Sequence, residues 1–112
     1  MESKSLDIGS VIYRQGIEPG TLEATWCHSI GGQGTGIATG GPATGFVGRY
    51  IIRYFNQDGQ FDVEFILKIA KNGDLYDVSW FDGDKVIYQG LGMVVEGRLV
   101  VGWRGIDEIT GS

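Results

Sequence analysis

The 112-residue sequence contains very few of the residues on which several common classes of protein depend. It has one cysteine, Cys27, and one histidine, His28. A single cysteine cannot form an intrachain disulfide. One histidine and one cysteine cannot complete a structural zinc site, which takes four nitrogen or sulfur ligands. We therefore expect neither a disulfide scaffold nor a metal site, and no motif in the chain points to a cofactor.

Long apolar segments and an excess of basic charge are also missing. No apolar run exceeds four residues, which is far short of a membrane span. The polar N-terminus leads into no hydrophobic signal segment. Nine Lys and Arg against fourteen Asp and Glu give a net charge of −5, whereas nucleic acids and anionic membranes attract basic surfaces. We expect a cytoplasmic protein that binds neither nucleic acid nor membranes.

Alanine, the strongest helix former, occurs only four times, whereas glycine occurs 20 times. Glycine thus makes up about 18% of the chain, against about 7% in an average protein. The remaining composition is rich in the β-branched and aromatic residues that favour strands. A chain of this length is typical of one domain. The composition therefore predicts a single all-β domain spanning residues 1–112.

Turn residues recur at regular intervals along the chain, and the most definite are Asp58-Gly59, Asn72-Gly73 and Asp82-Gly83. Such pairs supply the positive φ angles that tight hairpins require. The segments between the turns predict strands at Val11–Arg14, Leu22–His28, Gly34–Ala38, Phe46–Phe55, Phe61–Ala70, Leu75–Phe81, Lys85–Val94 and Arg98–Arg104. Eight antiparallel strands in this order can close into a small barrel, which removes the exposed sheet edges. A sandwich or an open curled sheet is the alternative.

An internal repeat supports this arrangement. Leu22–Trp26 resembles Tyr76–Trp80, Gln33–Ile37 resembles Gln89–Met93, and Gly48–Tyr54 resembles Gly97–Trp103, at offsets of 54, 56 and 49 residues. The three blocks occur in the same order in both copies, and the first copy carries an insertion near residues 39–45. The repeat predicts that Trp26 matches Trp80, Gly34 matches Gly90 and Arg49 matches Arg98. At the level of architecture, the meander, the Trp-bearing strands and the repeated Gly-x-Gly resemble small calycin-like barrels of the avidin and lipocalin type.

Three motifs invite a chemical interpretation but fit a structural one better. The glycine-rich segment 31–41 lacks the Gly-Lys-Ser/Thr ending of a phosphate-binding loop, and no helix is predicted after it. The acidic turns lie in separate hairpins, whereas calcium needs six or more converging oxygens. Asp62 and Glu64 alternate with the apolar residues of their strand, so we expect both to face solvent.

The aromatic residues are the best candidates for a functional site. Alternation along the strands, combined with the repeat, predicts that one interior surface gathers Trp26, His28, Tyr50, Tyr54, Tyr76, Trp80 and Trp103. A core without water would normally use Leu, Ile and Phe, because buried Tyr and Trp need hydrogen-bond partners. These seven residues therefore predict either a filled core with polar tips at the barrel rims or a cavity for a flat, partly polar ligand.

Three functions remain open at this stage. The first is binding of a hydrophobic or aromatic small molecule inside the barrel. The second is a cyclase- or isomerase-type enzyme on the same barrel, with His28 and a tyrosine as acid and base. The third is a structural or oligomerising module with a filled core. Ile51, Val100 and Phe81 are expected on the outer face, where they form either the contact of a homo-oligomer or scattered apolar surface residues.

Overall fold

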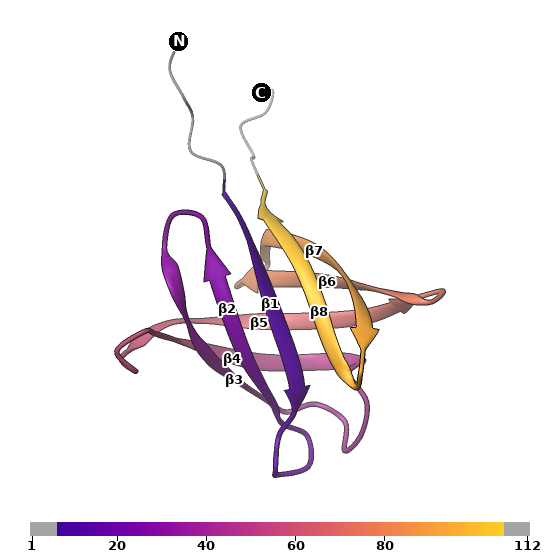
Figure 1. Cartoon of the computed structure of the whole chain (residues 1–112). Helices are drawn as coiled ribbons and strands as arrows, with labels where there is room; N and C mark the ends of the chain where they lie inside the picture. The colour runs from indigo at the N-terminus through magenta and orange to yellow at the C-terminus, as the bar shows by residue number, and fades with distance from the viewer. Residues whose placement is uncertain (1–6, 107–112) are drawn as a thin grey trace.

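The computed structural model describes residues 7–106, which form a closed antiparallel barrel of eight strands (Figure 1). The strands are β1 (Ile8–Gln15), β2 (Leu22–His28), β3 (Gly32–Thr39), β4 (Gly48–Asn56), β5 (Phe61–Asn72), β6 (Leu75–Asp82), β7 (Lys85–Val95) and β8 (Arg98–Gly105). Each strand pairs with the next along the chain, and β8 pairs back with β1. The described residues contain no helix. The predicted all-β meander and its closure into a barrel are confirmed, so the sandwich and the open sheet do not apply.

The strand boundaries agree with the predicted ones within a few residues, and β4 differs in an informative way. The prediction began this strand at Phe46, but the strand begins at Gly48, and residues 40–47 form a loop. Phe46 is buried within that loop, and its carbonyl oxygen accepts a hydrogen bond of 2.9 Å from the Tyr50 hydroxyl. The Phe46 side chain therefore packs into the core from the loop, and Phe46 does not belong to the paired part of β4.

Side chains alternate strictly between the interior and the outer surface along most of the strands, as a barrel requires. In β2, for example, Leu22 and Ala24 are buried while Thr25 is exposed. The buried core consists of Val11, Tyr13, Leu22, Ala24, Ala38, Phe46, Tyr50, Ile52, Tyr54, Leu67, Ile69, Val78, Trp80, Leu99 and Val101. On the outer surface Arg53 pairs with Glu64 at 2.8 Å, and Ile51 is exposed as predicted.

Each copy of the internal repeat corresponds to three consecutive strands of the barrel, β2–β3–β4 in the first copy and β6–β7–β8 in the second. Trp26 pairs with Gly34, whereas its counterpart Trp80 pairs with Tyr88. Gly34 therefore matches Tyr88, and the predicted match with Gly90 is wrong by two residues. Gly90 instead matches Gly36. Gly36 pairs with Tyr54, and Gly90 pairs with Trp103.

Several glycines inside the barrel make room for large aromatic rings on neighbouring strands. A Cβ at Gly34 would lie 2.8 Å from the indole of Trp26, and a Cβ at Gly36 would lie 2.8 Å from the ring of Tyr54. A Cβ at Gly9 would collide with the indole of Trp103. Part of the glycine content thus leaves space for large aromatic side chains inside a small barrel.

The two ends of the barrel differ. The closed end is where β1 ends and β2 begins, and the loop of residues 40–47 covers it. Phe46 packs into the core there, while the Gln15 side chain donates a 2.8 Å hydrogen bond to the carbonyl oxygen of Gly45. Gly41 donates a backbone hydrogen bond of 3.1 Å to Gly20, which fastens the loop to the β1–β2 connection. The opposite end, where β2 finishes at His28, has no such cover among the described residues, and we call it the open end.

Exposed apolar side chains are found on several strands and loops, and β7 carries four of them, among which Leu91 and Met93 are each 53% exposed. The expected homo-oligomer stays a prediction. Within residues 7–106, no helix is long and apolar enough to cross a membrane.

Candidate ligand-binding cavity

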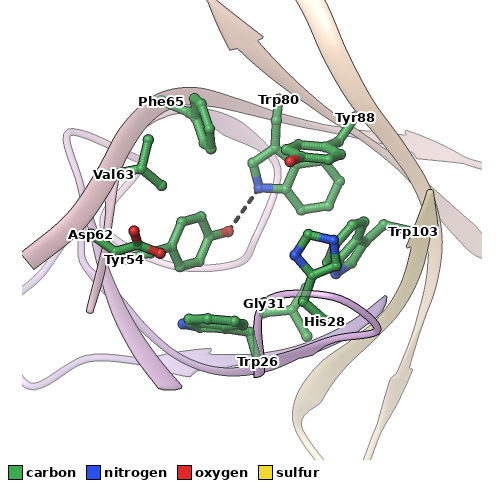
Figure 2. Close-up of a pocket in the computed structure, with 11 residues that line it drawn as sticks. Trp26, His28, Gly31, Tyr54, Asp62, Val63, Phe65, Trp80, Tyr88 and Trp103 are labelled. Carbon is green, nitrogen blue, oxygen red and sulfur yellow. Dashed lines mark hydrogen bonds between the residues drawn. The ribbon is translucent and has the colours of Figure 1, made fainter. Parts of the chain in front are cut away.

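A cavity of about 310 Å³ occupies the open end of the barrel and communicates with solvent (Figure 2). Its volume lies at the lower limit of small-molecule sites, which are roughly 300–1,000 Å³. All three tryptophans of the chain contribute to its lining. The lining residues are Val11, Trp26, His28, Gly31, Tyr54, Asp62, Val63, Phe65, Trp80, Tyr88 and Trp103.

The inner limit of the cavity is a chain of hydrogen bonds across the barrel. The indole nitrogen of Trp80 on β6 donates to the hydroxyl oxygen of Tyr54 on β4, at 2.7 Å (Figure 2). The same hydroxyl lies 2.6 Å from that of Tyr13 on β1. Trp80 and Tyr54 are 3% and 9% exposed, and Tyr13 is completely buried. These two hydrogen bonds therefore join β1, β4 and β6, and they separate the filled half of the barrel from the open half.

The positions of the two hydroxyl protons follow from burial. If Tyr54 donated to Tyr13, the Tyr13 proton would need another acceptor, and the buried Tyr13 hydroxyl forms no other hydrogen bond with the described residues. An unsatisfied buried donor costs about 1–3 kcal/mol. If Tyr13 donates to Tyr54, both lone pairs of the Tyr54 oxygen are used, and its own proton stays free on the cavity side. This second arrangement satisfies the core and leaves one hydrogen-bond donor at the base of the cavity.

Burial also keeps both hydroxyls protonated. Desolvation raises the pKa of Tyr54 to about 12, although the hydrogen bonds with Tyr13 and Trp80 act in the opposite direction. Desolvation, together with the nearby Tyr54, raises the pKa of Tyr13 well above its ordinary value. The Tyr54 hydroxyl is therefore a neutral donor at physiological pH and not a nucleophile or a base.

The sides of the cavity are formed by aromatic rings that contact one another at steep angles. The Tyr88 and Trp103 ring centroids are 4.9 Å apart, and those of Phe65 and Tyr88 are 5.9 Å apart. The ring centroids of Trp26 and Tyr54 are 6.1 Å apart, and the Trp26 indole nitrogen donates a 2.8 Å hydrogen bond to the carbonyl oxygen of Thr35. Figure 2 shows the Trp26 ring edge-on, so that it turns one face toward the cavity. The rings therefore surround the cavity with π surface.

The mouth of the cavity carries acidic groups. His28 Nε2 lies 2.6 Å from the Asp7 carboxylate, in a hydrogen bond at the start of β1 and the end of β2. Asp62 lies among the lining residues and forms no ion pair or hydrogen bond with other described residues. Burial raises the pKa of Tyr88, and the negative charges of Asp7 and then Asp62 raise it further. Two carboxylates therefore act on the same tyrosine at the mouth of the cavity.

A β-bulge explains why Asp62 lines the cavity. Tyr54 pairs with Val63, but the next residue, Phe55, pairs with Phe61, so Asp62 is an extra residue without a partner on β4. A bulge interrupts the alternation of side chains and redirects the bulged residue. Both Asp62 and Glu64 are exposed, as expected. Glu64 pairs with Arg53 on the outer surface, whereas Asp62 also borders the cavity.

Five of the seven predicted lining residues meet at the cavity, namely Trp26, His28, Tyr54, Trp80 and Trp103. The two others do not. Tyr50 is buried near the closed end and donates its hydrogen bond to Phe46. Tyr76 packs against the core near the start of β6, where the ammonium of Lys71 lies 5.6 Å from its ring centroid. Both tyrosines face inward as predicted, but they lie on the wrong half of their strands to reach the cavity.

The sequence interpretation missed Val63, Phe65 and Tyr88 as lining residues. Val63 and Phe65 belong to the alternating apolar face of β5, so the signal was present and only their position along the barrel was lacking. Tyr88 is absent from the predicted set because the sequence repeat matches Gly34 to Gly90, whereas the strand pairing matches Gly34 to Tyr88, two residues earlier on β7.

Comparison with models of protein families, with curated proteins and with solved structures finds no match for this chain. The described residues contain no group of three or more His, Cys, Asp or Glu side chains that could hold a metal ion.

Proposed function

We propose that this protein binds a small hydrophobic or aromatic molecule in the cavity at the open end of the barrel. The observation that carries this proposal is the contrast between the two ends. Phe46 fills and covers one end, while at the other a ring of aromatic side chains surrounds about 310 Å³ of open space. Eight-stranded barrels of the lipocalin and streptavidin type hold one small ligand in the same way, so the architectural resemblance supports the proposal.

The cost of leaving the cavity open favours a ligand. Trp, Tyr and Phe rings bury about 150–250 Å² each when they pack, and rings that border open space forgo part of that contact. A ligand that fills the cavity would restore it. Leu or Ile at positions such as Trp26 or Trp103 would be the simpler choice if the barrel only needed a packed core.

The free proton of Tyr54 adds a polar element to the expected ligand. It faces the cavity beside the indole of Trp80, so it can donate to a carbonyl, ether or hydroxyl oxygen at the inner end of a bound molecule. The ligand that fits best is therefore flat, largely apolar, and equipped with one acceptor at the end that enters first.

Tryptophan fluorescence tests this proposal, since all three tryptophans line the cavity. We expect at least one member of a panel of aromatic and hydrophobic molecules to shift the emission and raise the melting temperature. Val63→Phe should fill part of the cavity and abolish both effects while the barrel still folds, whereas Val47→Phe, on the exposed loop of the closed end, should preserve them. No spectral shift with any molecule, or an equal response in both variants, would refute binding in the cavity.

The His28–Asp7 hydrogen bond favours a second candidate, an isomerase- or cyclase-type reaction on the bound molecule. A carboxylate bonded to one imidazole nitrogen fixes the tautomer and orientation of a general base. The Tyr88 ring, 6.4 Å from that of His28, is the nearest tyrosine that could serve as the acid. Mass spectrometry of the bound ligand after long incubation tests this candidate. Conversion that is lost in His28→Gln would support it, and unchanged ligand would leave binding alone.

A further inference from the structure

We propose that the ligand of this cavity carries a positive charge, and that the site recognises an organic cation such as a quaternary or protonated amine. This inference rests on the proposed binding function and specifies the chemical class of the ligand. Two independent features of the site support it, namely the aromatic rings that surround the cavity and the carboxylates at its mouth.

The aromatic rings provide the first feature. Each π face carries partial negative charge and attracts a cation within about 6 Å of its centroid, most strongly when the ring belongs to Trp. The cavity has three tryptophans, with Tyr88 and Phe65 between them. On the side formed by Trp80, Tyr88, Trp103 and Phe65, neighbouring ring centroids are 4.9–6.4 Å apart. A trimethylammonium group that enters this ring would contact several faces at once, as in the aromatic cages that bind quaternary amines.

The charges at the mouth provide the second feature. Asp62 borders the cavity and has no cationic partner among the described residues. The Asp7 carboxylate accepts a hydrogen bond from His28 Nε2 at the mouth, and its negative charge raises the pKa of the neighbouring Tyr88. None of the lining residues is Lys or Arg. The lining therefore offers no Lys or Arg to an anionic ligand, whereas the carboxylates at the mouth attract a cation.

The bulge at Asp62 connects the two features. Without it, Asp62 would continue the regular alternation and lie on the outer surface beside Glu64, away from the cavity that it borders in the structure while still exposed. Bulges often redirect a side chain next to a functional site. Here the bulge places a carboxylate without an ion-pair partner among the described residues beside a cavity lined mainly by aromatic rings.

A pair of probes of equal shape tests the proposal. The 4-hydroxyphenyltrimethylammonium ion and 4-tert-butylphenol differ only in a cationic nitrogen in place of a carbon, and the shared hydroxyl keeps both soluble. We expect tryptophan fluorescence to give the cation a dissociation constant about tenfold lower than that of the neutral probe. Asp62→Asn should reduce this preference at least threefold. The matched control is Asp74→Asn, which makes the same charge change in the β5–β6 turn at the closed end.

Each outcome separates the two proposals. Equal affinities for the two probes would overturn the preference for cations while leaving a binding cavity. Equal effects of Asp62→Asn and Asp74→Asn would show that net charge, and not the Asp62 carboxylate, produces the preference, which would also overturn the inference. If neither probe binds and the wider panel of molecules also gives no response, the proposed function fails and this inference fails with it.

Discussion

The indole nitrogen of Trp80 and the hydroxyl oxygen of Tyr54 are 2.7 Å apart, and their hydrogen bond lies where the filled half of the barrel meets the open half. On one side of this bond Tyr13 continues the chain into the core, and on the other side is the cavity. The packing of the core and the geometry of the candidate site therefore depend on the same pair of side chains.

Replacement of Tyr13 with Phe should lower the free energy of unfolding by about 1 kcal/mol, because it removes a buried hydrogen bond and little volume. The matched control is Tyr76→Phe. The Tyr76 hydroxyl has no hydrogen-bond partner among the described residues, so its loss should change stability by less than about 0.5 kcal/mol. Urea unfolding of both variants makes the comparison. Equal effects of the two substitutions would mean that the Tyr13–Tyr54 bond contributes nothing.

Alkaline pH should destabilise the folded protein through the same two hydroxyls. In the unfolded chain tyrosine has a pKa of about 10, whereas burial raises the pKa of Tyr54 to about 12 and that of Tyr13 well above the ordinary value. Above pH 10 the unfolded chain therefore loses protons that the folded barrel retains, so stability falls as pH rises from 10 toward 12. Below pH 10 both states keep these protons and this contribution is constant.

Urea midpoints measured from pH 8 to 11.5, with tyrosinate absorbance recorded in parallel, check this effect. The folded protein should contain less tyrosinate than the urea-unfolded chain at pH 10.5, and Tyr13→Phe should show a shallower fall in stability. Parallel curves for the variant and the unmodified protein would contradict the assignment.

Glycine at position 9 should be far less replaceable than glycine at position 102, although both lie in strands. A Cβ at Gly9 would collide with the Trp103 indole and the carbonyl oxygen of Cys27, whereas nothing lies within 4 Å of a Cβ at Gly102. We expect Gly9→Ala to cost about 1–3 kcal/mol of stability, and Gly102→Ala to be neutral or slightly stabilising. Thermal unfolding of the two variants decides the matter, and a similar loss in both would rule out the contact with Trp103 as the cause.

Trp103 should contribute more to binding than to folding. Replacement with Phe keeps a ring but removes part of the aromatic surface beside His28 and Tyr88. We expect the affinity for the best ligand of the panel to fall about three- to tenfold, while stability changes by less than about 1.5 kcal/mol. Isothermal titration calorimetry and urea unfolding measure the two quantities. A loss of about 3–5 kcal/mol in stability without any change in binding is the pattern of an ordinary core residue and would contradict this role.

The sequence predicted the eight strands and their closure because hairpin glycines and two-residue alternation are local signals. It also predicted that Trp26, Trp80 and Trp103 face inward. Alternation determines the face of a side chain but not its height along the barrel axis, and for this reason Tyr50 and Tyr76 were assigned to the cavity and lie outside it. Height depends on the stagger between strands, which only the pairing registers reveal.

Two further features depended on departures from regular pairing. The bulge at Asp62 moves a carboxylate to the cavity mouth, and no residue type in that segment signals it. The two-residue shift of the repeat on β7 hid Tyr88, because Gly90 resembles Gly34 in sequence but occupies the place of Gly36. Glycine repeats therefore identified the related strands correctly and their register incorrectly.

The most direct test of a binding cavity at the open end is a two-dimensional ¹H–¹⁵N NMR titration with the best ligand of the panel. The indole signals of Trp26, Trp80 and Trp103 report from three sides of the cavity, and the backbone signals of residues 40–47 report from the closed end. We predict saturable shifts of all three indole signals, with one common dissociation constant and little change in the loop. Shifts confined to the outer surface or to the loop, or no shifts up to the solubility limit of every ligand, would contradict a binding cavity inside this barrel.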